Sequence, residues 1–286
     1  MFKIISYRLI ALIPNYTFSP LAAKTMKFTI LGSGTSTGVP LVGCSCATCL
    51  SLDPRDKRLR PSLLIESPTT TVVVDTSADF RYQMLRYRVQ KIDAVVFTHH
   101  HFDHIGGFDD LRAFNFMLRK AMPIYLMEET MENLHRTFIY AFTNTGQKGG
   151  GVPVVERNII DNNPFVIGDI EFIPIPMMHG KMRVNGYRIG NFAYCTDTNY
   201  ISEESFALLK DLDILILDAL RYDAHTTHFN VEQAVAAAKR IKAKQTYFTH
   251  IAHNIKHDEL DAKLPPEIRV GYDGLQWEMP HLSLFH

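Results

Sequence analysis

The sequence predicts a layered α/β domain with β-sheet inside and helices outside. Two observations carry this prediction: short β-rich apolar runs alternate with segments of helical periodicity from Met26 onward, and the predicted strands outnumber the helices that fall between them. The chain has 286 residues, of which 46% are hydrophobic and 21% charged, as in ordinary globular proteins. This length is enough for one large domain whose layers close around a sheet.

Each predicted strand is a short β-rich run bounded by turn residues, and each predicted helix repeats its apolar residues at three- and four-residue spacing. Two of the helices also begin with a capping side chain, at Ser202 and at Asn230. The predicted strands cover residues 28–31, 62–66, 71–75, 94–98, 123–126, 152–160, 170–175, 184–189, 192–195, 214–218 and 246–249. The predicted helices cover residues 78–88, 107–118, 128–140, 202–209 and 231–241.

The first 25 residues are expected to lie outside this domain. They contain a brief apolar run at 9–13, but Pro14 cuts it short of the hydrophobic region of a signal peptide. Met26 opens directly into the first predicted strand, which indicates either a misplaced start or a disordered extension before it. We therefore divide the chain into an N-terminal extension, residues 1–25, and one domain, residues 26–286.

Charge and cysteine content limit the partners and the compartment. Lysine and arginine number 30, as do aspartate and glutamate, so the net charge is zero and a basic field for a long nucleic acid is not expected. No run approaches the ~20 apolar residues of a membrane-spanning helix, so no membrane partner is expected. Cys44, Cys46 and Cys49 are too crowded for a disulfide framework, and such reduced thiols predict a metal site and the cytoplasm. A homodimer is left open beside a monomer.

A histidine-rich loop follows the predicted strand at 94–98. Its sequence is Thr98-His99-His100-His101-Phe102-Asp103-His104, and the carboxyl end of a strand is where α/β proteins commonly place their sites. In a tight turn the side chains of His99, His101, Asp103 and His104 can point toward one place but cannot all bind one ion. The spacing therefore predicts two metal ions side by side, the arrangement that activates water for a displacement reaction.

Further ligands are expected at the ends of other predicted strands, where His179, Asp197 and His250 lie. A carboxylate can bridge two cations and a neutral imidazole cannot, so Asp197 is predicted to be shared. One ion is then held by His99, His101, His179 and Asp197, and the other by Asp103, His104, His250 and Asp197, with a hydroxide between the ions. These nitrogen and oxygen ligands suit two divalent cations such as zinc or manganese.

The pattern His-x-His-x-Asp-His, with later His, Asp and His at strand ends, resembles the metallo-β-lactamase superfamily over the chain from Met26 onward. The resemblance implies a four-layer αββα sandwich and a metal-dependent hydrolase. A narrower resemblance, to the phosphoribosyl 1,2-cyclic phosphate phosphodiesterases, is carried by the segments at 32–40, 43–49, 248–253 and 270–274. It implies one structural zinc held by Cys44, Cys46, Cys49 and His253, and three thiolates with one imidazole would also close a tetrahedral zinc site on chemical grounds.

The same resemblance implies that His228 protonates the leaving oxygen, a task that suits a histidine pKa near neutral pH. His225, three residues upstream, is the alternative general acid. His228, Asp103 and Asp197 are thus the predicted catalytic residues. Arg112 is either a phosphate clamp or a solvated charge, and Asp273 is expected to orient a metal-bound imidazole.

The predicted function is a phosphodiesterase that acts on small or cyclic phosphodiesters, such as phosphoribosyl cyclic phosphates or nucleotide-like molecules, through a hydroxide between two metal ions. One alternative is a tRNA 3′-end processing endonuclease of the same superfamily, although the basic arm that those enzymes use to hold tRNA has no counterpart in this sequence. Another is a non-catalytic carrier or binding protein of cofactor biosynthesis, against which the complete ligand set argues.

Overall fold

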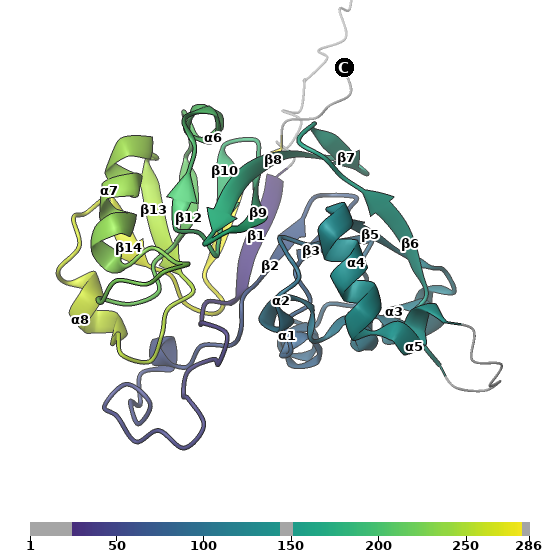
Figure 1. The fold of residues 1–286 in the computed structure, drawn as a ribbon, viewed down its shortest axis with the longest axis horizontal. Helices are drawn as coiled ribbons and strands as arrows, with labels where there is room; N and C mark the ends of the chain where they lie inside the picture. The colour runs from purple at the N-terminus through teal and green to yellow at the C-terminus, as the bar shows by residue number, and fades with distance from the viewer. Residues whose placement is uncertain (1–24, 144–150, 282–286) are drawn as a thin grey trace, which may run out of the picture.

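The computed structural model describes residues 25–143 and 151–281, and these residues form the predicted four-layer αββα sandwich (Figure 1). The two β-sheets lie face to face in the middle, with one group of helices outside each sheet. Apart from Thr25, the predicted N-terminal extension lies outside the described residues. None of the helices in the described ranges is long and apolar enough to cross a membrane.

The first sheet has the strand order β15-β1-β2-β3-β4-β5-β6. The neighbours β15 and β1, β1 and β2, and β2 and β3 pair antiparallel. The strands from β3 to β6 pair parallel. The bounds are β1 Thr25–Gly32, β2 Ser62–Glu66, β3 Thr71–Val74, β4 Ala94–Val96, β5 Met122–Leu126, β6 Val155–Ile159 and β15 Gln276–Pro280. Because β3, β4 and β5 run in parallel, their carboxyl ends meet at one edge of the sheet.

The second sheet has the order β11-β8-β9-β10-β12-β13-β14, and β7 pairs with β8. Its bounds are β7 Phe165–Ile167, β8 Ile170–His179, β9 Met182–Ile189, β10 Phe192–Cys195, β11 Tyr200–Ile201, β12 Ile214–Asp218, β13 Gln245–Thr249 and β14 Ile268–Val270. Strands β10, β12, β13 and β14 are parallel, so their carboxyl ends also meet at one edge.

The helices cover the outer faces of the two sheets. Their bounds are α1 Phe80–Arg86, α2 Phe102–Ile105, α3 Leu111–Leu118, α4 Glu128–Thr137, α5 Ile139–Phe142, α6 Glu203–Leu208, α7 Val231–Ile241 and α8 His257–Asp261, with 3₁₀ turns at Pro54–Asp56 and Phe108–Asp110. Helices α1 to α5 lie on the side of the first sheet, and α6 to α8 on the side of the second (Figure 1).

Three apolar clusters hold these layers together. The central cluster lies between the sheets, where the rings of Phe28 and Phe192 stack at a centroid distance of 4.0 Å. A second cluster packs the helices that include Phe80 and Phe114 onto the first sheet, and a third packs α7 onto the second through residues such as Ala234. Burial of this apolar surface is the main force that fixes the two sheets against each other.

The predicted elements agree with this structure except at several boundaries. The segment predicted as one helix at 107–118 is a 3₁₀ turn followed by α3, and the segment at 128–140 divides into α4 and α5. Strand β8 continues to His179, four residues beyond the predicted end. The short elements α2, α8, β7, β11, β14 and β15 were not predicted, because each is held by neighbouring segments rather than by a strong local pattern.

Candidate metal centre

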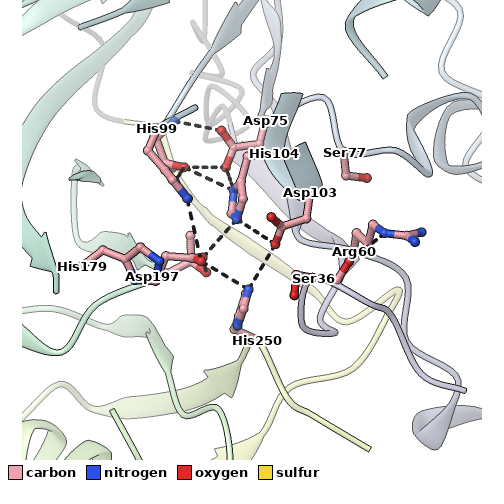
Figure 2. A network of polar contacts seen from close by, with 12 residues as sticks. Ser36, Arg60, Asp75, Ser77, His99, Asp103, His104, His179, Asp197 and His250 are labelled. Atoms are coloured by element: carbon pink, nitrogen blue, oxygen red, sulfur yellow. Dashed lines mark hydrogen bonds and ion pairs between the residues drawn. The ribbon is translucent and has the colours of Figure 1, made fainter. Parts of the chain in front are cut away.

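The carboxyl ends of strands from both sheets meet at one edge of the sandwich, where the predicted site residues lie. The register pairs Val74 with Val96 and Asp218 with Thr249, so the residues that follow these strands emerge beside one another. His99, Asp103 and His104 follow β4, Asp197 follows β10, His250 follows β13, and His179 ends β8 (Figure 2). Segments that are far apart in the sequence thereby deliver their side chains to one place.

The backbone at three of these strand ends is strained. Asp75, Asp197 and His250 have φ angles of 63°, 55° and 62°, in the left-handed region that residues other than glycine rarely adopt. Strain of this kind costs of order 1–3 kcal/mol per residue and persists where the surrounding structure holds it. Here the sharp turns redirect the side chain at the point where each strand ends.

Asp103, His104, Asp197 and His250 form a compact buried cluster. Their ligand atoms all lie within 4.8 Å of one another. The Nε2 atom of His104 is 3.1 Å from Asp197 Oδ2 and 3.4 Å from Asp103 Oδ2, and the Nε2 atom of His250 is 3.3 Å from Asp197 Oδ1 and 3.4 Å from Asp103 Oδ2. Two imidazoles and two carboxylates thus face a common point, as Figure 2 shows.

A second cluster, of His99, His101 and His179, lies beside the first. Its ligand atoms are also within 4.8 Å of one another, and His101 is exposed whereas His99 and His179 are buried. The Nε2 atom of His99 is 3.9 Å from Asp197 Oδ1, so Asp197 stands between the two clusters. All seven residues predicted to bind the two ions are therefore brought together, in the predicted grouping.

The charges in the site favour cations. Burial opposes ionisation of Asp197 and Asp103, but the charge of His104 holds the pKa of both carboxyls below their usual range. Burial would also lower the pKa of His104, yet the surrounding carboxylates, Asp197 first, raise it well above its usual value. The pKa of His99 is lowered well below its usual value, by burial and then by the charge of His104. Two ionised carboxylates, Asp103 and Asp197, therefore face these imidazoles.

The donor atoms fit divalent cations. The Nε2 atoms of His99 and His104 are buried and make no hydrogen bond. A buried polar atom without a partner costs free energy, and both atoms face carboxylates, so a cation there would satisfy nitrogen and oxygen together. Imidazoles and carboxylates are ligands for zinc, manganese and iron alike. The site is therefore suited to divalent metal ions.

Neighbouring groups fix the orientation of the imidazoles. Asp75 Oδ2 lies 2.7 Å from His104 Nδ1, and a carboxylate can only accept, so the Nδ1 atom carries the proton and Nε2 points into the cluster. The carbonyl of Thr227 holds His179 Nδ1 in the same way, at 2.7 Å. Asp75 was not assigned from the sequence, although its place at the end of a strand beside the His99 loop was a usable signal.

His228 faces the two clusters from the loop before α7. Its ring lies 4.5 Å from that of His179 and 4.6 Å from that of His250, centroid to centroid. The Nδ1 atom is 2.8 Å from Asp218 Oδ2, which leaves Nε2 as the other proton-bearing position. Burial alone would lower the pKa of His228, but the charge and hydrogen bond of Asp218 raise it to about 9.

His225, the alternative general acid, makes its contacts within its own loop. Its Nδ1 atom contacts the backbone nitrogen and the hydroxyl of Thr227, at 3.3 Å and 3.2 Å, and its ring is 5.2 Å from that of His228. The structure therefore brings His228 rather than His225 against the clusters. Asp218, at the end of β12, was not assigned from the sequence either.

The three clustered cysteines meet His253. Cys44 Sγ and Cys46 Sγ lie 3.3 Å and 3.5 Å from His253 Nδ1, and all four ligand atoms are within 4.8 Å of one another. The backbone N–H of Cys49 and the His253 imidazole lower the pKa of the Cys46 thiol to about 6, which favours the thiolate. This grouping matches the one that the sequence predicted for a structural zinc.

One weaker expectation is wrong, and for Arg112 the structure fits one of the two alternatives, the solvated charge. Asp273 contacts no imidazole of the site; its carboxylate accepts from the backbone N–H and hydroxyl of Ser33 and from the backbone N–H of Leu59, so the orienting role assigned to it is wrong. Arg112 bonds to the carbonyl of Gly151 at 3.2 Å and pairs with Asp109 at 3.2 Å, as a partly exposed side chain would. Neither residue joins the clusters.

Comparison with known proteins agrees with this arrangement. The domain family described as Beta-lactamase superfamily domain matches residues 70–251, which make up more than half of the chain. This range contains all seven residues of the two clusters of the candidate metal centre. The chain therefore belongs to the metallo-β-lactamase superfamily. It is a hydrolase of that superfamily, and within it the chain resembles the PhnP-type phosphodiesterases.

Three similar proteins illustrate the range of the family. A crystal structure of a diphosphatase from the PhnP family is 42% identical, with a TM-score of 0.83, over 89% of this chain and 97% of that one. The probable metallo-hydrolase YhfI of Bacillus subtilis is 25% identical over 80% of this chain and 97% of its own. A protein of Porphyromonas gingivalis named octanoyltransferase is 37% identical over 88% of this chain, but the chain spans only 51% of that relative.

The octanoyltransferase name does not fit the site described above. Acyl transfer through a thioester needs a reactive thiol beside the substrate. In the described ranges, Cys195 is fully buried and burial raises the pKa of its thiol to about 12, while the other three thiols converge on His253. The site in this chain instead has the side chains of a metal-dependent hydrolase.

Proposed function

We propose that this chain is a phosphodiesterase that hydrolyses small or cyclic phosphodiesters, among them phosphoribosyl cyclic phosphates and nucleotide-like molecules. The observation that carries the proposal is the pair of adjacent clusters with Asp197 between them and His228 facing both. The relative that is 42% identical is described as a diphosphatase. In a substituted diphosphate, as in a phosphodiester, each phosphorus is linked through two oxygens to two other groups, so the two substrates present similar bonds for hydrolysis.

We assign seven residues to hold two divalent metal ions, with zinc and manganese as the candidates: His99, His101, Asp103, His104, His179, Asp197 and His250. Bound there, two such ions would activate water as the nucleophile and neutralise the charge that develops on the phosphoryl oxygens. Asp197 is the proposed shared ligand because its carboxylate lies 3.1 Å from His104 and 3.3 Å from His250 in one cluster and 3.9 Å from His99 in the other. Asp75 and the Thr227 carbonyl keep the imidazoles oriented toward the ions.

His228 is the proposed general acid. Asp218 accepts at the Nδ1 atom of its ring, so the proton available to a substrate is the one on Nε2. From this position the imidazole would donate that proton to the oxygen that leaves phosphorus, which prevents an unstable alkoxide from forming. Asp218 fixes the tautomer and balances the imidazolium charge, as a buried carboxylate beside a catalytic histidine does.

The test is an assay of the metal-loaded chain on bis(p-nitrophenyl) phosphate and on ribose cyclic phosphates. We expect turnover in the parent chain and a loss of roughly a thousandfold in kcat/KM for Asp103→Ala, because the second ion would lose a charged ligand. Asp109→Ala is the matched control, since Asp109 is a partly exposed carboxylate paired with Arg112 outside the clusters. Equal rates for the parent and Asp103→Ala chains would count against the proposal.

The alternatives differ in metal content and substrate. We expect about three ions per chain, two at the clusters and one zinc at the cysteine site, whereas a non-catalytic carrier would hold about one structural zinc alone. A tRNA endonuclease would cleave a tRNA precursor in preference to small diesters. The cytoplasmic location, the homodimer and the division of the chain at residue 26 stay predictions.

A further inference from the structure

A buried hydroxyl lies against the carboxylate of Asp197. Thr196 follows β10 and directly precedes Asp197, and both side chains are buried. The Thr196 Oγ1 atom donates to Asp197 Oδ2 at 2.6 Å. A hydrogen bond to a charged acceptor is shorter and stronger than one between neutral groups. The hydroxyl therefore holds one of the two carboxylate oxygens in a fixed direction.

The two oxygens of Asp197 have different surroundings. Besides the Thr196 hydroxyl, Oδ2 faces the Nε2 atom of His104 at 3.1 Å. Oδ1 lies 3.3 Å from His250 Nε2 and 3.9 Å from His99 Nε2, and Figure 2 shows the carboxylate between these three imidazoles. The terminal torsion of an aspartate side chain has a broad energy minimum, so the carboxylate turns easily unless a contact holds it. The hydrogen bond from Thr196 opposes that rotation.

The backbone contacts around Asp197 leave this task to Thr196. The N–H of Thr198 donates to Asp218 Oδ2 at 2.9 Å, and the Thr198 hydroxyl donates to the carbonyl of Met178 at 3.1 Å. These contacts fix the turn in which Asp197 has its positive φ angle, but they do not touch its carboxylate. In the part of the chain that the structure describes, Thr196 is the only hydrogen-bond donor outside the imidazoles that contacts this carboxylate. The orientation of the carboxylate therefore depends on the Thr196 hydroxyl.

The orientation of Asp197 matters most to the second cluster, which consists of three histidines. Imidazoles bind metals as neutral rings, so they do not balance the charge of a cation. In the first cluster Asp103 supplies a further carboxylate, whose Oδ2 atom lies 3.4 Å from His104 Nε2 and from His250 Nε2. An ion in the second cluster would depend on Asp197 for negative charge, through the oxygen that lies 3.9 Å from His99. A turned carboxylate would thus weaken the binding of this ion more than that of the other.

We propose that Thr196 is a positioning residue, whose hydrogen bond directs the Asp197 carboxylate toward both clusters and so secures the ion at the three histidines. The inference rests on the proposed function, which assigns two ions to these clusters. A group that orients a metal ligand typically contributes roughly 10- to 100-fold to metal affinity. Thr196 acts only through Asp197 and is not itself a catalytic residue.

Zinc binding by a variant without the hydroxyl tests the proposal. Thr196→Val replaces the hydroxyl with a methyl group of similar size, so the side chain still fills its buried place. Competition with a chromophoric chelator measures the affinity of the full chain for each zinc ion. We expect one ion to bind roughly 10- to 100-fold more weakly than in the parent, with a smaller loss at the other ion of the centre. Zinc at the cysteine cluster should keep its parental affinity, because its ligands lie outside this centre.

Matched variants separate the hydrogen bond from packing. Thr196→Ser keeps the hydroxyl and should restore most of the lost affinity. Thr29→Val changes an equally buried threonine of β1, outside both clusters, and should bind zinc as the parent does. If Thr196→Val fails to fold, the cysteine cluster loses its zinc too, and Thr196→Ala, which also lacks the hydroxyl, replaces it in the measurement. Parental affinities in the folded variant, or an equal loss at all three sites, would overturn the proposal.

Substitution with cobalt gives a second readout that needs no turnover. Co²⁺ bound to nitrogen and oxygen ligands absorbs in the visible range, whereas thiolate ligands add a separate charge-transfer band. We expect Thr196→Val to change the bands of the nitrogen and oxygen site and to keep the thiolate band. That result in a chain that hydrolyses no phosphodiester would support the role of Thr196 and reject the proposed reaction. Turnover in the parent together with unchanged metal binding in Thr196→Val would reject the role of Thr196 and leave the reaction standing.

Discussion

Two buried aspartates, Asp75 and Asp218, perform the same task at the ends of two strands in different sheets. Each accepts at the Nδ1 atom of a histidine, His104 in one case and His228 in the other. A carboxylate in this position sets which ring nitrogen faces the site and raises the basicity of the imidazole. The two sheets therefore present imidazoles of fixed tautomer to the same space, one for a metal ion and one, as proposed, for the leaving oxygen.

The role of His228 can be tested through the leaving group. A general acid matters most when the departing oxygen is strongly basic, so His228→Ala should lose roughly 10²- to 10⁴-fold in kcat with an alkyl or ribose leaving group. With p-nitrophenolate, which needs little protonation, the loss should be much smaller. His225→Ala is the matched control and should lower neither rate substantially. An equal loss on both substrates would show that His228 acts in another way.

His257, outside the candidate metal centre, makes the free energy of unfolding depend on pH. His257 packs against the Arg58 guanidinium, and burial with the charges of Arg58 and Arg55 lowers its pKa from 6.5 to about 4. The unfolded chain thus binds a proton between pH 6.5 and 4 that the folded chain does not, so this contribution to stability is present above pH 6.5 and lost as the pH falls to 4.

His257→Asn should therefore flatten the pH dependence of the unfolding free energy across that window. A shift of one pKa unit corresponds to ~1.4 kcal/mol. Between pH 6.5 and 4 the unfolding free energy of the parent should therefore fall by at most about 3 kcal/mol more than that of the variant. Urea unfolding at several pH values measures it. Identical pH profiles for the parent and the variant would show that His257 keeps its ordinary pKa in the folded chain.

At the scale of the elements, helix α7 shows how a local pattern supports the site. Asn230 accepts from the Gln233 N–H at 2.9 Å, and the Gln233 side chain accepts from the Asn230 N–H at 3.1 Å, so the helix starts with a complete capping box. His228 lies two residues before this start, and Phe229 N–H donates to the Thr198 carbonyl at 2.7 Å. The cap and this contact hold the loop against the segment that carries Asp197.

Asn230→Ala should cost about 1 kcal/mol of unfolding free energy, since it removes a side-chain cap. Asn230→Asp keeps an acceptor and should retain most of the stability. Lys239→Ala, on the exposed face of the same helix, is the control and should change it by less than about 0.5 kcal/mol. Denaturant unfolding separates these values, and a neutral Asn230→Ala would mean that the helix start is held by its tertiary contacts instead.

Elements with a strong local pattern were predicted well, and short ones were not. The strand at 192–195 and the helix at 231–241 have their predicted bounds, because apolar side chains repeat there with a clear period. Strand β14 has only three residues, and it is a strand because it pairs in parallel with β13, where Phe248 lies opposite Val270. Hydrogen bonds with a distant neighbour leave little trace in a local sequence, so such elements escape prediction.

At the scale of the whole molecule, the cysteine cluster ties the first loop to the end of β13. His253 of this cluster and His250 of the candidate metal centre are three residues apart on one segment. A metal bound by three thiolates and His253 would therefore fix the same segment that positions His250. Metal binding at the cysteine cluster would therefore link stability to the geometry of the candidate metal centre.

Cys46→Ser should lose one metal ion per chain and unfold at a lower temperature, because the bound metal contributes to folding. Metal analysis by mass spectrometry and thermal unfolding measure both effects. Cys195→Ala is the control: Cys195 is buried outside the cluster, so that variant should keep the full metal content. An unchanged metal content in Cys46→Ser would remove the assignment of a zinc site to this cluster.

The sequence by itself determined the α/β class and the list of side chains that meet at the candidate metal centre, because spacing within one loop and position at strand ends are local properties. It also pointed to the cysteine cluster. Only the tertiary structure decided which histidine faces the centre, His228 or His225, and which carboxylates orient the imidazoles. Those outcomes depend on the register of β12 beside β13 and on the packing of the two sheets. Such contacts between distant segments are set by the burial of the whole core, which no single segment encodes.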